Sequence, residues 1–450
     1  MTQKEKSFFD KFNDWMRSSI TIRIISIGIL ILILLIPASM IQSLIRERQY
    51  RSDDAIREVS SVWGEVQTIT GPVVTVPYKK YYVNEKKEVY TQTEYAHFLP
   101  EKLNIKGEIE PEKRHRGIYD VVVYTTKLNF KGSFNNIDFS EWKIKKEDIL
   151  WDEAFIAIGI PDMRGIKEAI DLSWNKSTFS FNPGLETNDV IANGVSTRIN
   201  ISGNELATEN SFSFSLKLRG SEELYFVPLG KTTDVELNAP WPNPKFQGAC
   251  LPDSHNVTDI DFSANWHRLH LNRNYPQKWL GNQYNVSDSS FGLALIIPVD
   301  HYQKSERSAK YAIMIIAFTF LIFFFVEVLN RTRIHPIQYL LVGLALIIFY
   351  SLLIAISEHI NFNISYLISS AATIVMVTLY SKSIYKNTRQ TTITGLTLVI
   401  LYGFIFITLQ LQDYALLMGS IGLFIVMAIV MYLSRKINWY EFGDKNDYLG

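Results

Sequence analysis

Five polar side chains lie in or beside long apolar stretches of the sequence, where a polar group is costly and is therefore a candidate for function. They are Glu327, His335, Gln338, Glu358 and His359. Because a histidine beside a carboxylate can titrate near neutral pH, Glu358 and His359 could respond to protons or to a ligand. Alternatively, all five side chains lie at the ends of apolar helices, where they cap the helices or pair with a neighbouring soluble domain.

The spacing separates these residues into two clusters. His335 and Glu358 are 23 positions apart, or about 35 Å of helix at about 1.5 Å per residue, so they cannot belong to one site. Neighbouring residues of a helix point in different directions, so Glu358 and His359 are not expected to face the same partner. The first cluster contains Glu327, Arg331, Arg333 and His335, and the second contains Glu358 and His359.

The sequence offers little support for enzymatic or metal chemistry. His267 and His270 lie in a segment that alternates like a strand, which places them on opposite faces and argues against a metal pair. Gly230-Lys231-Thr232 resembles the end of a phosphate-binding loop, but Tyr225 occupies the required upstream glycine position. Five acidic residues could act as glycosidase acids, although such residues are common on any solvated β surface: Asp152, Glu153, Asp162, Asp259 and Asp261. We therefore expect a non-enzymatic protein with no metal and no cofactor.

The composition restricts the class of protein further. The single cysteine, Cys250, excludes an intrachain disulfide and any zinc site built on two cysteines. The 450 residues include 45 basic and 45 acidic side chains, and this neutral balance excludes a generally polybasic nucleic-acid binder.

A proline-rich segment at 240–252 contains the aromatic residues Trp241 and Phe246 and could form a rigid binding rim. The alternative is a packed connection at a sheet edge, because proline cannot donate a hydrogen bond within a central strand.

The elements that must position these residues include six apolar stretches that reach or approach the roughly 20 residues of a membrane span. They lie at 22–45, 309–329, 337–357, 364–381, 391–411 and 414–433. Lysine and arginine occur in alternate short loops, which predicts that both termini are cytoplasmic and that residues 46–307 lie outside. The first stretch lacks a clear cleavage site, so a signal anchor is favoured over a cleaved signal peptide.

Residues 46–307 have short strand patterns separated by turn residues, as in Ser211–Leu218, where apolar and polar side chains alternate. This pattern predicts a large antiparallel, β-rich, sandwich-like domain of one or two submodules. Ile56, Val59, Trp63 and Val66 recur at helical spacing, which indicates a stalk extending the first span or a first packed helix of the domain. The predicted fold class is therefore an α+β membrane protein, with this domain inserted between the first and second of about six transmembrane helices.

The remaining segments complete the predicted organisation. Residues 1–21 are either an amphipathic interfacial helix on the cytoplasmic surface or the basic flank of a signal anchor. Residues 22–45 form the first span, 308–434 a five-helix bundle, and 435–450 a cytoplasmic tail. Small residues in the spans permit close helix packing and are compatible with a homo-oligomer.

Several strings occur in a characteristic order along the chain. They are Trp63-Gly64, the segment 71–77, Phe98-Leu99-Pro100, Leu251-Pro252, and, most specifically, the block 309–359 with His335-Pro336-Ile337-Gln338-Tyr339 and Ser357-Glu358-His359. These strings, together with the predicted order of one span, a β domain and five further spans, resemble the CreD inner-membrane protein family of bacteria.

The resemblance implies a location in the bacterial inner membrane and a role in envelope integrity or the envelope-stress response, and it implies no catalytic residues. We expect the periplasmic β domain to bind an envelope ligand or a periplasmic or membrane protein partner, and the spans to contact the lipid bilayer. The alternative is a transporter that moves a lipid, a peptide or another solute through the five-helix bundle.

Overall fold

The computed structural model describes residues 20–135, 137–199, 209–297, 301–330, 332, 334–411 and 414–435. It contains two compact units: a helical unit from residues 1–51 and 299–450, and a β unit from residues 52–298. Most of the predicted interfacial segment 1–21 and nearly all of the tail 435–450 lie outside the described residues. The division between the units falls inside one helix, α2, which therefore supplies residues to both.

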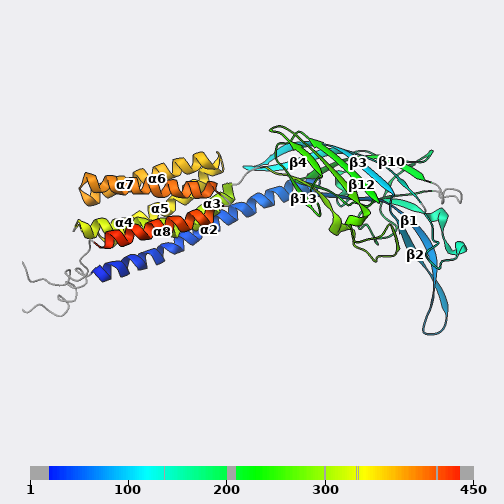
Figure 1. Ribbon diagram of the computed structural model, residues 1–450, viewed down its shortest axis with the longest axis horizontal. Coiled ribbons are helices and arrows are strands. Elements are labelled where there is room, and N and C mark those ends of the chain that lie inside the picture. The colour runs from blue at the N-terminus through cyan, green and yellow to red at the C-terminus, as the bar shows by residue number, and fades with distance from the viewer. Residues whose placement is uncertain are drawn as a thin grey trace, which may run out of the picture. The chain divides into compact units, whose positions relative to one another are not determined.

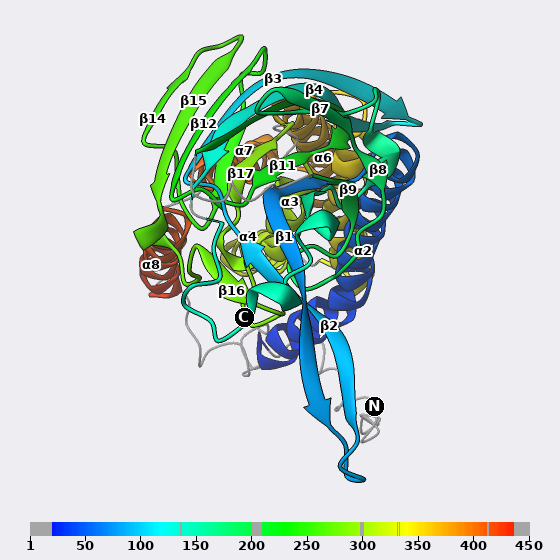
Figure 2. The same cartoon turned by 90° about the vertical axis from the view of Figure 1, so that its right-hand side faces the viewer.

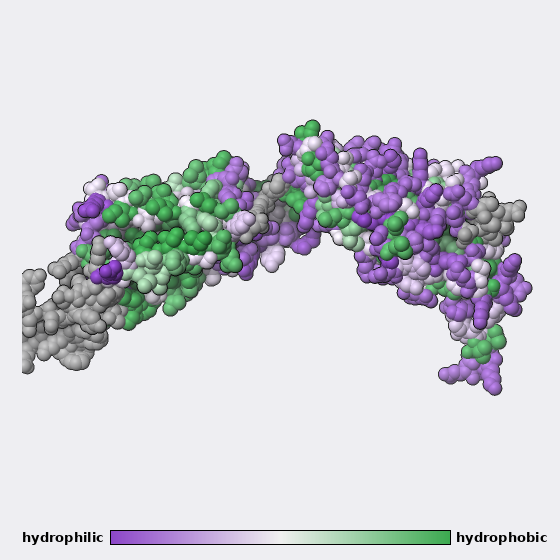
Figure 3. Space-filling view, in the orientation of Figure 1, coloured by the Kyte–Doolittle hydropathy of each residue, from purple (hydrophilic) through white to green (hydrophobic). Residues whose placement is uncertain are grey.

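Among the described residues, six helices are long and apolar enough to cross a membrane, which confirms the six predicted spans (Figure 1). They are α2 (Ile20–Trp63), α4 (Ala312–Leu329), α5 (Pro336–Ser357), α6 (Phe362–Tyr385), α7 (Thr388–Gln410) and α8 (Ala415–Ser434). A shorter helix, α3 (His301–Lys310), precedes α4. The space-filling view shows a largely hydrophobic surface on these helices, as expected for contact with lipid (Figure 3).

Helix α2 is 44 residues long and continues beyond the predicted first span. Ile56, Val59 and Trp63 lie in its last turns, which belong to the β unit. Val66, the fourth residue of the predicted pattern, lies beyond the end of the helix. The spacing of the other three residues belongs to an extension of the first span that is also the first helix of the β unit.

The β unit contains two sheets, which confirms the predicted β-rich, sandwich-like domain. The nine-stranded sheet contains β1 (Gln67–Val83), β2 (Val89–Phe98), β5 (Phe155–Gly159), β8 (Asn182–Pro183), β9 (Gly194–Arg198), β11 (Glu223–Phe226), β13 (Pro244–Gly248), β16 (Lys278–Leu280) and β17 (Phe291–Leu295). The eight-stranded sheet contains β3 (Lys102–Arg116), β4 (Tyr119–Phe134), β6 (Asp171–Trp174), β7 (Ser177–Ser180), β10 (Asn210–Ser221), β12 (Thr232–Ala239), β14 (Ser254–Val257) and β15 (Phe262–Leu269).

The two sheets share one hydrophobic core, to which β1 contributes Val74, β5 contributes Phe155, β4 contributes Phe130 and β12 contributes Leu237. Strand β10 buries Phe212, Phe214 and other alternate residues, as its sequence pattern predicts. Most strand pairs are antiparallel, but β1 pairs with β11 and β3 pairs with β12 in parallel. This core lies within the compact unit of residues 52–298.

Short 3-10 helices connect several strands: η1 (Lys146–Asp148), η2 (Trp151–Glu153), η3 (Met163–Gly165), η4 (His270–Asn272) and η5 (Ser287–Ser289). Strands β1 and β2 extend beyond the sheets as a long hairpin (Figure 2). The end of this hairpin is exposed, with Val83 and Val89 66% and 67% accessible.

Candidate functional site: polar contacts along helix α2

Glu327 is a buried carboxylate within the helical unit. It lies on α4, is 4% exposed, and forms an ion pair with Arg23 of α2 at 3.1 Å. The hydroxyl of Tyr339 on α5 donates to the other carboxylate oxygen at 2.9 Å. Glu327 therefore connects three helices. Its predicted neighbours Arg331 and Arg333 lie outside the described residues.

His335 and Gln338 close the amino end of α5. The Nδ1 atom of His335 accepts from the backbone N–H of Ile337 at 3.3 Å, and Gln338 Oε1 accepts from the backbone N–H of His335 at 2.9 Å. Such reciprocal bonds satisfy donors that the first turn of a helix leaves free. This arrangement accounts for both polar side chains as a helix cap.

Glu358 follows the last residue of α5, and its side chain is 9% exposed. Its carboxylate lies 3.8 Å from Arg48 of α2, and Tyr302 of α3 donates to it at 3.4 Å. His359 is exposed. Glu358 therefore takes partners from α2 and α3, and its sequence neighbour His359 is not among these contacts.

Helix α2 has two further polar contacts within the helical unit. Arg46 pairs with Glu306 of α3 at 3.7 Å, and Gln42 donates to the backbone carbonyl of Ala309 at 3.4 Å. Together with Arg23 and Arg48, these residues link α2 to α3, α4 and α5.

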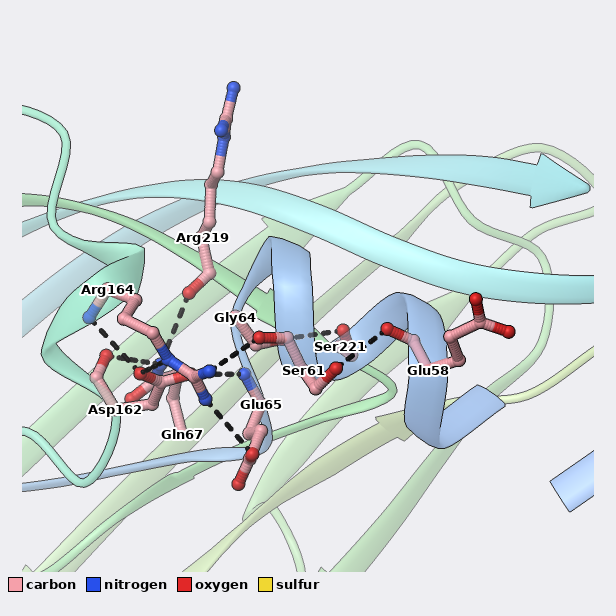
Figure 4. Close-up of polar contacts among 9 residues, drawn as sticks. All are labelled: Glu58, Ser61, Gly64, Glu65, Gln67, Asp162, Arg164, Arg219 and Ser221. Carbon is pink, nitrogen blue, oxygen red and sulfur yellow. Dashed lines mark hydrogen bonds and ion pairs between the residues drawn. The ribbon is translucent and has the colours of Figure 1, made fainter. Parts of the chain in front are cut away.

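Arg164, the middle residue of η3, holds the last turns of α2 within the β unit (Figure 4). Its Nη1 donates to the backbone carbonyl of Ser61 at 2.6 Å, and its Nη2 pairs with Glu65 at 3.0 Å. Its Nε bonds to Asp162 at 2.8 Å. The guanidinium of Arg164 thus joins the end of α2, Glu65 and the η3 turn.

Asp162 completes this cluster from the buried side. Its carboxylate accepts from the backbone N–H groups of Glu65 at 2.9 Å and Arg164 at 3.1 Å. Burial by itself would raise the pKa of Asp162, but the hydrogen bonds from Arg164 and the two backbone groups outweigh it and hold the pKa below its usual range. Asp162 is therefore ionised at neutral pH and serves as a structural acceptor.

Gly64 ends the helix at a place where no other residue fits. Its φ is +142°, and an added Cβ would lie 2.8 Å from the carbonyl oxygen of Arg219. Ser221 donates to the carbonyl of Gly64 at 2.6 Å (Figure 4). Beside it, the indole of Trp63 donates to the carbonyl of Tyr124, and the Arg219 guanidinium lies 3.9 Å from the ring centre. The end of α2 is thus bound to β4 and β10.

Among the other predicted residues, Trp241 is buried and its indole donates to the carbonyl of Ile296 at 3.2 Å. Phe246 lies on β13, the edge strand of the nine-stranded sheet, and its ring packs against Trp266. Both aromatic residues therefore contribute to packing at a sheet edge, and a binding role for this segment stays a prediction.

His267 and His270 lie on different elements. The candidate acids lie at three places in the β unit: Asp152 and Glu153 on η2, Asp162 just before η3, and Asp259 and Asp261 between β14 and β15. His267 is on β15 and contacts Asp234 at 2.6 Å, whereas His270 begins η4. Asp162 is engaged at the end of α2, as described above. Asp261 accepts a hydrogen bond from Thr258 at 2.6 Å. His267, Asp162 and Asp261 therefore contact local neighbours in the fold.

Comparison with known proteins agrees with this architecture. Residues 19–440 match the family described as inner membrane protein CreD. The chain is 34% identical over 422 residues to inner membrane protein CreD of Escherichia coli (strain K12), and the alignment covers 92% of each chain. The protein therefore belongs to the CreD family of inner membrane proteins.

Proposed function

We propose that this protein is a non-enzymatic component of the bacterial inner membrane that supports envelope integrity under stress. The β unit binds an envelope ligand or a protein partner in the periplasm, and α2 transmits the bound state to the helical unit. Both termini are cytoplasmic in this proposal. The observation that supports it most directly is that one continuous helix makes polar contacts within each unit.

The contacts of the candidate polar residues support a role without catalysis. His335 and Gln338 are used in a helix cap, Glu358 in contacts with α2 and α3, and Asp162 in the cluster at the end of α2. Each of these groups satisfies a neighbour in the fold, as structural polar groups do.

The transporter remains the second candidate, because Glu327 is a carboxylate buried among the helices. Buried ionisable side chains of membrane-spanning helices occur on ion and proton pathways. A transporter that uses Glu327 needs this group to exchange a proton or to bind a cation, whereas an envelope component needs it only as a hydrogen-bond acceptor.

Replacement of Glu327 by glutamine separates the two candidates. The amide keeps the size of the side chain and an oxygen that accepts from Tyr339, but it cannot ionise. The measurement is uptake of a membrane-impermeant dye, under envelope stress, by cells that lack the protein and are complemented with wild type or E327Q. Membrane insertion of each chain is measured in parallel.

We expect E327Q to restore the barrier as wild type does. An inserted E327Q chain that leaves the cells permeable would favour transport and contradict the proposal. Glu306→Gln is the matched control, because Glu306 is a more exposed carboxylate of the same unit, paired with Arg46 and Lys310.

A further inference from the structure

A cavity of about 220 Å³ lies in the β unit, where the end of β15 meets η4, η5 and the segments after β11 and β13. Two arginines, Arg268 and Arg273, line it, together with Cys250, Asn272 and Ser289. Among the described residues, those that line the cavity include no carboxylate. We propose that this cavity binds a small oxyanion, a carboxylate or a phosphate group, between Arg268 and Arg273.

Arg273 has the properties of a ligand-binding cation. All three nitrogens of its guanidinium are buried, and none has a hydrogen-bond partner among the described residues. Its guanidinium carbon lies 4.3 Å from the ring centre of Tyr275, a contact with the ring face. The hydroxyl of Tyr275 is engaged by Ser289 at 2.8 Å and by the carbonyl of Pro228 at 3.3 Å.

A buried donor group without an acceptor is unfavourable, and it is more so when the group is charged. Burial lowers the pKa of the Arg273 guanidinium, although arginine stays protonated in proteins. The charge therefore persists. Because the three nitrogens are closed to solvent, the Arg273 side chain must turn toward an anion in the cavity to gain the missing acceptors.

Arg268 is held in a fixed orientation at the same cavity. Its Nε contacts the sulfur of Cys250 at 2.8 Å, its Nη2 donates to the carbonyl of Leu251 at 2.5 Å, and Asp253 lies 3.4 Å away. Asp253 is not part of the cavity lining. These contacts use Nε and Nη2, so Arg268 would offer Nη1 of an already oriented guanidinium to an anion in the cavity.

A neighbouring cavity of about 270 Å³ has the opposite character. It is lined by the carboxylates of Asp234, Glu236 and Asp253, with Lys106 among them. The preference for an anion therefore belongs to the first cavity and is not a general property of this face. The volume of the first cavity suits an anionic group rather than a drug-sized molecule, since such ligands occupy pockets of about 300–1,000 Å³.

This inference rests on the proposed function in one respect, because it gives a chemical class to the ligand of the β unit. Its test uses purified full-length protein in detergent and is independent of the complementation experiment. Inorganic phosphate and acetate are titrated separately, and chloride at equal ionic strength is the reference for screening by salt. Binding is followed by titration calorimetry and by the thermal unfolding midpoint.

We expect saturable binding of phosphate or acetate, and no saturable effect of chloride. Arg273→Gln is expected to weaken binding at least tenfold, whereas Arg198→Gln, which removes an exposed arginine of the same unit, leaves binding unchanged. Arg268→Lys keeps the charge but loses the guanidinium that Cys250 and Leu251 orient, and is expected to weaken binding several-fold. It also provides a test if Arg273→Gln fails to fold.

The sources of the anion are separated by a competition arm with a short-chain phosphatidylglycerol below its micelle concentration. Displacement of phosphate identifies a lipid headgroup as a ligand, and lack of displacement identifies a free anion; both results require an occupied cavity. Absence of saturable binding by either oxyanion up to about tenfold above the physiological millimolar range would overturn the proposal. Equal binding by wild type and a folded Arg273→Gln would also overturn it.

Discussion

At the scale of single residues, Asp162 shows how one ionised side chain stabilises the end of α2. Its folded pKa lies below the unfolded value of about 3.9 for aspartate. A lowered pKa adds stability that is fully present above the unfolded value and is lost as the pH falls through the folded value. The contribution of Asp162 should therefore be constant at neutral pH and decline in acid.

Asp162→Ala removes the acceptor for two backbone N–H groups and for Arg164. We expect it to lower the free energy of unfolding of the β unit by about 2 kcal/mol at pH 7, since hydrogen bonds to charged groups contribute about 1.5–3 kcal/mol. The difference from wild type should narrow below about pH 4. Tryptophan fluorescence during urea unfolding measures this, because seven of the nine tryptophans lie in residues 52–298.

Asp152→Ala is the matched control, since Asp152 is an exposed aspartate of the same unit. A loss of stability of similar size for Asp152→Ala, or a difference for Asp162→Ala that persists unchanged at pH 3, would contradict this explanation.

At the scale of elements, the hairpin of β1 and β2 has side-chain hydrogen bonds near its base and an exposed end. Near the base, the hydroxyls of Tyr78 and Tyr82 and the ammonium of Lys80 converge on the carboxylate of Glu94. Beyond this cluster, Val83 and Val89 are mostly exposed. We expect the base to contribute to stability and the exposed end to contribute little.

Replacing residues 83–89 by Asn-Gly joins Tyr82 to Tyr90, which already face each other across the hairpin. Asn-Gly forms the two-residue turn that suits such a connection. We expect the unfolding free energy to change by no more than about 0.5 kcal/mol, as for other exposed positions. Urea unfolding checks this, with Glu94→Ala as the variant that should destabilise the unit. A loss above about 2 kcal/mol on shortening would show that the hairpin end is part of the fold.

The elements differ in how far the sequence predicts them. The span predicted at 337–357 corresponds to α5 at Pro336–Ser357, because the length of a membrane helix follows from a local apolar run. The strand at Ser211–Leu218 was equally clear from its alternation. The parallel pairing of β3 with β12 was not predictable, because it joins segments more than 100 residues apart and leaves no local pattern.

The candidate site was predictable only in part, for the same reason. Glu327 and Glu358 were recognisable from their apolar surroundings, but their partners Arg23 and Arg48 lie about 300 residues away along the chain. Asp162 was one acidic residue among many until the fold placed it beside Glu65. Arg273 gave no sequence signal, because burial without an acceptor is a property of the folded β unit alone.

At the scale of the whole molecule, the proposed function depends on the continuity of α2. The helix passes without interruption from the helical unit into the β unit at residues 51–52. Asp53 and Asp54 are exposed positions just beyond this division, so both can be changed without loss of core packing. Proline and glycine cost a helix interior about 3 and about 1 kcal/mol relative to alanine.

Two chains that differ only at these positions test whether the protein needs a continuous α2 to function. One has Asp53→Pro with Asp54→Gly, and the other has Asp53→Ala with Asp54→Ala. Dye uptake under envelope stress is measured in complemented cells, and insertion and tryptophan fluorescence show that both units are intact. We expect the alanine chain to restore the barrier, and the proline-glycine chain, although inserted and folded, to leave the cells permeable. Full restoration by the proline-glycine chain would show that the continuity of α2 is not needed for function.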